Sequence, residues 1–191
     1  MRIIAGRFKG LRLSAPRTRG VRPTTDRVRE ALFSTLGPAV VGVRVLDLFA
    51  GTGAFGFEAL SRGAASVVFV DIDRRMAETL NKTCRAWKID EQVLILTMSA
   101  DRALRKLADT SERFAIIFLD PPYGTEWVSS VVGDPILESL FASDGLLIIE
   151  REEKASDLAI PKWFRREFGR KYGDTVVEIF RYDGGDPSVF P

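Results

Sequence analysis

The sequence predicts an α/β fold in which helices cover both faces of a mostly parallel β-sheet. Near-continuous apolar runs of strand length alternate with helical segments, which is the pattern of parallel strands buried on both sides. The end of the chain differs, because two strand-like runs flank Tyr172-Gly173-Asp174 and predict an antiparallel hairpin. With 191 residues, 46% of them hydrophobic, the chain is long enough for one domain around a sizeable core.

A small hairpin and a helix are expected before the sheet begins. Residues 3–14 hold two short apolar pieces separated by glycines, which predicts a β-hairpin. Residues 24–36 place apolar side chains at helical spacing. Thr24 or Thr25 is the expected cap of this helix, and Gly37-Pro38 is its expected end.

The alternation of strand and helix then fills the rest of the body. Each strand is a short apolar run, and each of the first three is followed by a helical segment. The expected strands are residues 43–50, 66–73, 92–98, 114–120 and 145–150, and the helical segments are 51–64, 74–89 and 100–107. A connection broken by Gly133 and Pro135 leads to the fifth strand.

Composition excludes several classes of chemistry. The chain has no histidine, which removes Ser-His-Asp and Cys-His catalysis, and its one cysteine leaves little for a metal site. A single cysteine also forbids an internal disulfide and favours a reducing, cytoplasmic setting. No apolar stretch approaches the roughly 20 residues needed to span a bilayer. We therefore expect a cytoplasmic protein without metal or membrane attachment.

Positive charge is concentrated at the start of the chain. Residues 1–30 carry nine basic and two acidic groups, a net charge of +7, whereas the whole chain is +2 and the remainder is −5. Arginine, which binds phosphates through a fork of donors, supplies all but one of the cations. We therefore expect residues 1–22 to be an arm that binds nucleic acid, attached to a domain over residues 23–191, although a merely solvated terminus is the alternative. The expected contacts are Arg2, Arg7, Lys9, Arg12, Arg17, Arg19 and Arg22, and neighbouring glycines predict that the arm is mobile without its partner.

A glycine turn after the first strand predicts a nucleotide-type pocket. Gly51-x-Gly53-x-x-Gly56 separates a strand from a helix, where a ligand can approach the backbone. This pattern alone fits a dinucleotide, S-adenosylmethionine or a tight turn without ligand. Asp47, four residues before the turn, repels a pyrophosphate but suits the ammonium and sulfonium of S-adenosylmethionine.

Two further acids follow the second and third strands. Asp71 ends its strand about 20 residues after the turn, where a carboxylate can accept both hydroxyls of a ribose. Asp101 follows the third strand and could accept an exocyclic adenine amine. The alternative for Asp101 is an acid that stabilises the first turn of a helix.

The fourth strand ends abruptly in Asp120-Pro121-Pro122-Tyr123. Ligands of open parallel sheets lie outside the carboxyl ends of the strands, so this loop is expected at the pocket. The prolines stiffen it and lack N–H groups. Asp120 and the Pro121 carbonyl can accept both hydrogens of a planar base's amine, while Tyr123 stacks on the base. A strand end with a simple proline turn is the alternative.

Together these motifs resemble those of a known group of enzymes. "DLFAGTG" followed by "DPPY" resembles class I S-adenosylmethionine-dependent amino-methyltransferases. "MRIIAGRFKGLRL", "RPTTDRVREALF" and "LDLFAGTGAFGFEALSRGA" narrow the resemblance to the RsmD family, over almost the whole chain. That family methylates N2 of one guanine of 16S ribosomal RNA, guanine 966 in the usual numbering.

The resemblance implies a Rossmann-like, seven-stranded sheet and a set of site residues. S-adenosylmethionine is the implied cofactor, and 16S rRNA or the assembling small ribosomal subunit is the implied partner of a monomeric protein. Asp71 departs from the glutamate that the family often has there. The implied catalytic residues are Asp120, Pro121, Pro122 and Tyr123; the cofactor residues are Asp47, Phe49, Gly51, Gly53, Asp71, Ile72 and Asp101, with Thr24 and Thr25 helping to close the pocket.

Some alternatives stay open on the sequence. An adenine-N6 or cytosine-N4 methyltransferase acting on RNA or DNA fits Asp-Pro-Pro-Tyr as well, and a non-catalytic RNA-binding module fits the arm. Cys84 follows a threonine, as in cytosine-C5 RNA methyltransferases, but its place within a helix predicts a packing role. Trp87 is expected in the core, whereas Trp127 and Trp163 receive no assignment.

Overall fold

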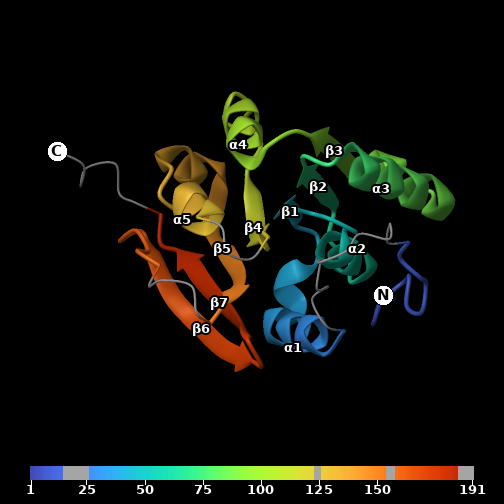
Figure 1. The fold of residues 1–191 in the computed structure, drawn as a ribbon, viewed down its shortest axis with the longest axis horizontal. Helices are drawn as coiled ribbons and strands as arrows, with labels where there is room; N and C mark the ends of the chain where they lie inside the picture. Colours follow the sequence, from blue (N-terminus) through green and yellow to red (C-terminus); the bar gives the residue numbers. More distant parts are fainter. Residues whose placement is uncertain (15–25, 123–125, 154–157, 185–191) are drawn as a thin grey trace.

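Seven strands form one sheet in the order β3-β2-β1-β4-β5-β7-β6 (Figure 1). The computed structural model describes residues 1–14, 26–122, 126–153 and 158–184. β1 to β5 are parallel, whereas β7 is antiparallel to both β5 and β6, which confirms the predicted fold class and its final hairpin. The bounds are β1 Arg44–Leu48, β2 Ser66–Asp71, β3 Val93–Thr97, β4 Phe114–Leu119, β5 Phe141–Glu152, β6 Phe164–Tyr172 and β7 Thr175–Tyr182.

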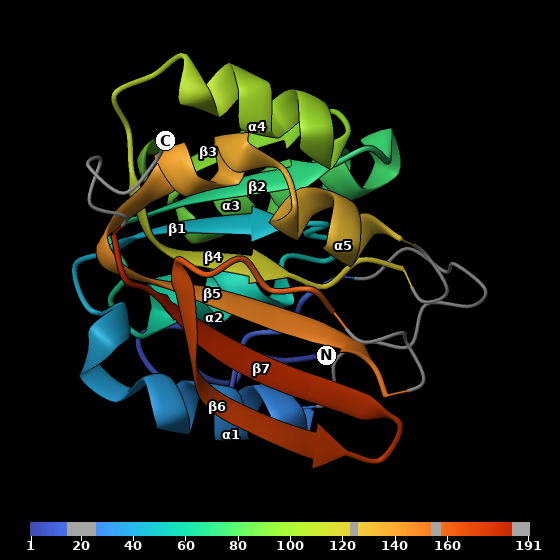
Figure 2. The same ribbon diagram turned by 90° about the vertical axis from the view of Figure 1, so that its left-hand side faces the viewer.

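Helices cover both faces of the sheet, as predicted (Figure 2). The chain moves outward from β1 to β3 and then returns to β4, and right-handed crossovers place the helices before and after this reversal on opposite faces. No helix within the described residues has the length and apolar character needed to cross a membrane. One face carries α1 Asp26–Leu36, α2 Ala54–Ser61 and α3 Arg74–Trp87; the other carries α4 Ala100–Ala108, α5 Trp127–Val132 and the 3-10 helix η3 Pro135–Leu140, while η1 Gly37–Val40 and η2 Asp90–Gln92 are short 3-10 turns.

The connection between β4 and β5 holds more structure than the sequence indicated. α5 ends before Gly133, and Pro135 begins η3, a position where proline is tolerated because the first N–H of a helix has no partner. β5 is also longer than the expected strand at residues 145–150. Its first residue, Phe141, pairs with Phe114 through an irregular register. The glycine and proline therefore mark helix boundaries rather than an irregular segment.

Residues 1–14 form a hairpin that we call the strap. Arg2 and Arg12 are paired in an antiparallel bridge, and the Ile3 amide donates to the Leu11 carbonyl at 3.0 Å. Ile3 and Leu13 are buried in the same core cluster as α1 and α2. The predicted hairpin is confirmed, and its side chains and amides contact the body. The mobility expected of the arm without its partner stays a prediction. The expected domain boundary at residue 22 lies outside the described residues.

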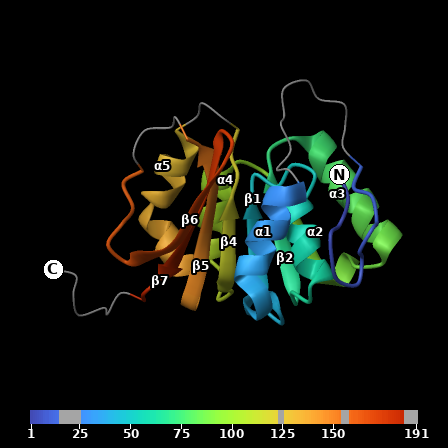
Figure 3. The same ribbon diagram turned by 90° about the horizontal axis from the view of Figure 1, so that it is seen from below.

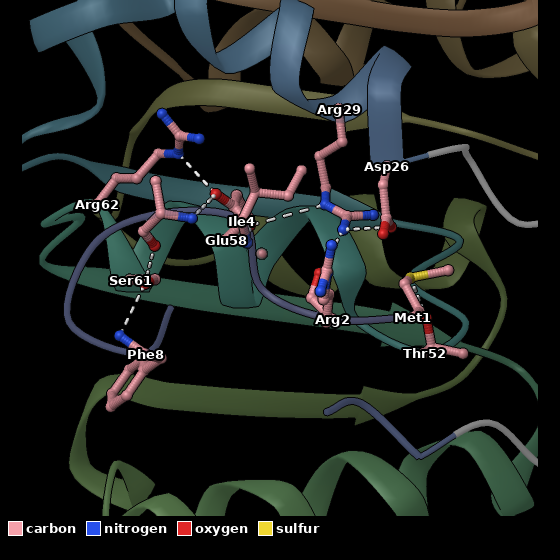
Figure 4. Close-up of polar contacts among 12 residues, drawn as sticks. Met1, Arg2, Ile4, Phe8, Asp26, Arg29, Thr52, Glu58, Ser61 and Arg62 are labelled. Atoms are coloured by element: carbon pink, nitrogen blue, oxygen red, sulfur yellow. Dashed lines mark hydrogen bonds and ion pairs between the residues drawn. The ribbon is translucent and has the colours of Figure 1, made fainter. Parts of the chain in front are cut away.

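The strap lies along α2, and two side chains of that helix hold it (Figures 3 and 4). Glu58, which is fully buried, accepts the amides of Ile4 at 2.8 Å and Ala5 at 3.1 Å. Ser61 accepts the Phe8 amide at 3.0 Å and donates to the Ala5 carbonyl. The amides of Ile4, Ala5 and Phe8 have no backbone acceptor within the strap. The side chains of α2 supply the acceptors that a neighbouring strand would otherwise provide.

A buried ion pair closes the same junction. Arg29 of α1 lies 3.7 Å from Glu58 and donates to the Arg2 carbonyl at 2.6 Å and to Asp26 at 3.0 Å. Only 1% of its surface is exposed. Arg29 is one of the nine basic groups of residues 1–30, but its buried guanidinium pairs inside the fold and adds no exposed charge.

We expect Glu58→Ala to lower the free energy of unfolding by about 3–5 kcal/mol, because it removes the buried carboxylate that balances the Arg29 charge and accepts the amides of Ile4 and Ala5. Denaturant titration would measure the loss. Glu112→Ala is the matched control, since Glu112 pairs with Arg44 where both side chains are 39% exposed, and it should cost about 1 kcal/mol or less. Equal costs for the two variants would contradict a stabilising role for the buried pair.

Candidate active site

Three of the predicted acids converge at the carboxyl edge of the sheet. Asp47 lies in β1, Asp71 ends β2 and Asp120 follows β4 directly. The charges of Asp120 and Asp71 both act on Asp47 and contribute to raising its pKa. This edge is where the strand order reverses between β1 and its two neighbours, the usual ligand position in open α/β sheets.

Asp47 is a carboxyl group enclosed by the core. Its neighbours across the sheet are Phe69 and Phe118, and only 1% of its surface is exposed. It accepts one hydrogen bond, from the Gly56 amide in α2 at 3.1 Å. Burial raises the pKa of Asp47 well above its usual value, and the nearby acids raise it further, against the Gly56 bond that lowers it. A cation bound at this edge would stabilise the ionised form of Asp47 and lower its pKa.

Asp71 holds the turn that follows β1. Its carboxylate accepts the Gly51 amide at 2.7 Å and the Asp73 amide at 2.8 Å. Partial burial raises the pKa of Asp71 despite these bonds. The second β-strand is thus tied to the turn of the first, and the carboxylate is fixed before any ligand arrives.

The turn itself has an unusual backbone. Phe49 has φ +66°, a left-handed conformation that a bulky residue rarely adopts, and Gly51 and Gly53 also have positive φ. A Cβ at Gly51 would meet nothing nearer than 4.0 Å, so this residue has the open side that a ligand needs. At Gly53 a Cβ would lie 2.5 Å from Leu80, and at Gly56 2.3 Å from Phe69. Those two glycines serve the packing of α2 against the core.

Two apolar side chains stand exposed beside these acids. Ile72, directly after Asp71, is 72% exposed. Trp127, the first residue of α5, is 37% exposed, and its ring lies 6.0 Å from that of Phe49. The role of Trp127 has no signal in the sequence, because nothing in the spacing of residues 120–127 relates it to a turn more than 70 residues earlier.

Asp101 makes local contacts at the start of α4. It is the second residue of that helix, and it lies 3.4 Å from Arg105 on the next turn. A hydrogen bond with Ser99 and the helix-start amides lower its pKa. This geometry agrees with an acid that stabilises a helix start. Whether Asp101 also contacts a ligand stays a prediction.

The remaining predicted residues are placed only in part. Pro121 is buried and Pro122 is exposed, while Tyr123 lies outside the described residues, as do Thr24, Thr25, Arg17, Arg19 and Arg22. Arg2, Arg7, Lys9 and Arg12 are exposed on the strap, and Arg7 contacts Gln92 and the Phe8 ring.

The two side chains assigned to packing are confirmed there. Cys84 is buried in the core, and burial raises the pKa of its thiol to about 11, which removes it as a nucleophile near neutral pH. Trp87 packs its ring 5.2 Å from Phe57 and 5.0 Å from Phe8 of the strap.

Solved structures define the class of this fold. The structure of yhhF from Escherichia coli matches 97% of this chain with 99% of its own, at 31% identity and a TM-score of 0.84. The RNA methyltransferase of Salinibacter ruber, solved with S-adenosyl-L-homocysteine, covers 89% of this chain and 99% of its own with a TM-score of 0.64, and at 15% identity it is similar in fold alone. The fold is that of the class I methyltransferases.

Sequence comparison then gives the family. The family model described as "Conserved hypothetical protein 95" matches residues 1–181. Ribosomal RNA small subunit methyltransferase D of Escherichia coli is 36% identical over 152 residues, which cover 80% of this chain and 75% of that protein. The chain belongs to this family, the RsmD family, as its motifs indicated.

We expect Asp47→Asn to stabilise the ligand-free protein at neutral pH. The raised pKa means that the ionised Asp47 costs free energy in the fold, whereas asparagine can still accept the Gly56 amide. A raised carboxyl pKa contributes stability that is complete below the unfolded-state pKa and is lost as pH rises through the folded-state pKa. The gain from Asp47→Asn should therefore be largest at neutral pH and disappear in acid, below the ordinary pKa of aspartate.

Thermal unfolding of both proteins from pH 3 to pH 8, without ligand, would measure this difference. Asp109→Asn, at an exposed aspartate, is the control and should change little at any pH. A variant at position 47 that is less stable at pH 7 than at pH 4, relative to the natural protein, would contradict a buried charge that destabilises the fold.

Proposed function

We propose that the protein transfers a methyl group from S-adenosylmethionine to the N2 amine of one guanine of 16S rRNA, guanine 966 in the usual numbering. The observation that carries the proposal is the convergence of Asp47, Asp71 and Asp120 at one edge of a methyltransferase fold. The rRNA substrate is supported by family membership and by the name of the Escherichia coli relative.

The residues at the edge fit a cationic nucleoside. Asp71 is expected to accept the ribose hydroxyls with the oxygen lone pairs that the Gly51 and Asp73 amides leave free. The open side of Gly51 lets the ligand approach the turn, and Asp47 supplies negative charge for the ammonium group. Ile72 offers an exposed apolar surface for the adenine ring, and Asp101 is the proposed acceptor for the adenine amine.

The bound cofactor supplies an electrophilic methyl group on a positively charged sulfur. Asp120 and the Pro121 carbonyl are proposed to accept the two hydrogens of the guanine amine. Neither Pro121 nor Pro122 has an N–H group, so the backbone there offers acceptors without competing donors. When these two acceptors hold both amine hydrogens, the nitrogen lone pair points toward the methyl group. After the transfer, Asp120 or water takes the proton that the nitrogen releases.

The strap is the proposed RNA-binding element. Its four exposed cations lie on a hairpin that contains no acid, and Met1 reaches the cofactor turn, where the Thr52 hydroxyl lies 3.7 Å from its sulfur. Phosphates bound along the strap would therefore lie near the edge that holds Asp120. A monomeric, cytoplasmic protein without a metal stays a prediction.

Analysis of nucleosides from a deletion strain would test the reaction directly. We expect mass spectrometry of its 16S rRNA to show the loss of one N2-methylguanosine, which the purified protein restores with S-adenosylmethionine. Loss of N6-methyladenosine or N4-methylcytidine would favour the alternative bases. An unchanged modification pattern, with no methyl transfer in vitro, would favour a non-catalytic RNA-binding protein.

We expect Asp120→Asn to lower the rate of methyl transfer by about 100-fold or more, because the acceptor acts on the amine as it reacts. The affinity for S-adenosylmethionine, measured by calorimetry, should change little. Asp109→Asn serves again as the control. Near-normal turnover by Asp120→Asn would refute the role of this carboxylate while leaving the methyltransferase assignment intact.

A further inference from the structure

Two arginines of the strap face one another across its bridge. Arg2 and Arg12 are directly opposed in an antiparallel pair, so both side chains leave the same face of the hairpin. Like charges in such a pair repel, and opposed positions normally avoid them. Neither guanidinium has an ion-pair partner within the part of the chain that the structure describes. An anion bound between the two guanidinium groups would attract both and offset their repulsion.

The two arginines also border a hollow in the surface. Among the described residues, its lining is Met1, Arg2, Arg12 and Asp26, and its volume is about 320 Å³. Asp26 is already engaged by Arg29 at 3.0 Å, which offsets its negative charge. The contact between Met1 and Thr52 places the hollow beside the turn that holds Gly51.

The body fixes the position of this pair. Arg29 donates to the Arg2 carbonyl at 2.6 Å, and Glu58 accepts the two amides that follow Ile3 (Figure 4). The backbone that carries Arg2 therefore cannot shift without breaking buried, charge-assisted bonds. Pre-organised cations lose less side-chain and loop entropy on binding than cations on a mobile arm.

We propose that Arg2 and Arg12 form a clamp for a single phosphate of the substrate RNA backbone, held in register with the cofactor turn by Arg29 and Glu58. The clamp rests on the proposed function, because it supplies the contact that aligns the RNA strand with Asp120. Phosphate contacts of this kind fix the register of a nucleic acid without reading its bases.

A double-mutant cycle would test whether the two arginines share one phosphate. The variants are Arg2→Gln, Arg12→Gln and the double substitution, and the measurement is filter binding of a 16S rRNA fragment over a range of KCl concentrations. In either single variant the remaining arginine should still neutralise the phosphate, so binding should weaken at low salt with little change in the salt slope. The double variant should lose the phosphate, and its salt slope should fall by about 0.7–0.9 in total.

Arg102→Gln with Lys106→Gln is the matched control, since both are exposed on α4 at the opposite face of the sheet. It should leave the salt slope unchanged. A salt slope that falls by about 0.7–0.9 in each single variant and by twice as much in the double variant would mean that the arginines contact two separate phosphates. Slopes unchanged in all three variants would mean that the arginines are only solvated. Either result would overturn the clamp.

Calorimetry with S-adenosylmethionine separates this proposal from the function on which it rests. The strap variants should bind the cofactor with unchanged affinity and methylate RNA at the natural maximal rate, with a raised KM for RNA alone. If the natural protein and the variants bind and methylate the RNA equally well, the clamp is overturned and the proposed function is not. A natural protein that neither binds nor methylates the RNA would overturn both.

A second prediction of the clamp concerns Glu58. Glu58→Gln removes the charge that anchors Arg29 and should raise the KM for RNA. In the background of Arg2→Gln and Arg12→Gln, the same substitution should have no further effect on KM, because the clamp that it positions is already absent. A further rise there would show that Glu58 acts on RNA binding by another route.

Discussion

The geometry of the edge depends on two carboxylates that hold one backbone turn. Asp47 accepts the Gly56 amide and Asp71 accepts the Gly51 amide, so β1 and β2 together fix both ends of the link between β1 and α2. Both acids are removed from water in the process, and burial raises both pKa values. The fold thus holds two acids in surroundings that disfavour their ionised form, and such shifted pKa values are typical of functional sites.

The short helix α2 connects this turn to the strap. Its first residues carry Gly56, which bonds to Asp47, and its later residues carry Glu58 and Ser61, which hold the strap. Two turns of helix therefore separate the proposed cofactor site from the support of the proposed RNA-binding element. A shift in one would move the other, because a helix of eight residues packed on all sides moves as a rigid unit.

The sequence was sufficient for the fold and for the acids, because both depend on local pattern. Apolar runs, glycine turns and strand-end aspartates are read directly, and the topology then brings Asp47, Asp71 and Asp120 to one edge. Interactions between distant residues left no local signal. In the sequence, Glu58 looks like any polar residue of a helix, and Arg29 looks like surface charge. Only the folded contact between them, beneath the strap, shows that both are buried. Trp127 and Phe49 meet only because β1 and β4 are neighbours.

The charge of the edge also discriminates between the two nucleotide ligands that a glycine turn can accept. A dinucleotide would bring the negative charge of its pyrophosphate close to Asp47, which would repel it at short range. An acid in the place of Asp71 binds the ribose of either ligand. S-adenosylmethionine carries a positive sulfonium and ammonium, which lower the pKa values that burial has raised. On the proposed function, the acidic character of Asp47 favours a cationic cofactor over a dinucleotide, because charges interact more strongly in a buried position than in water.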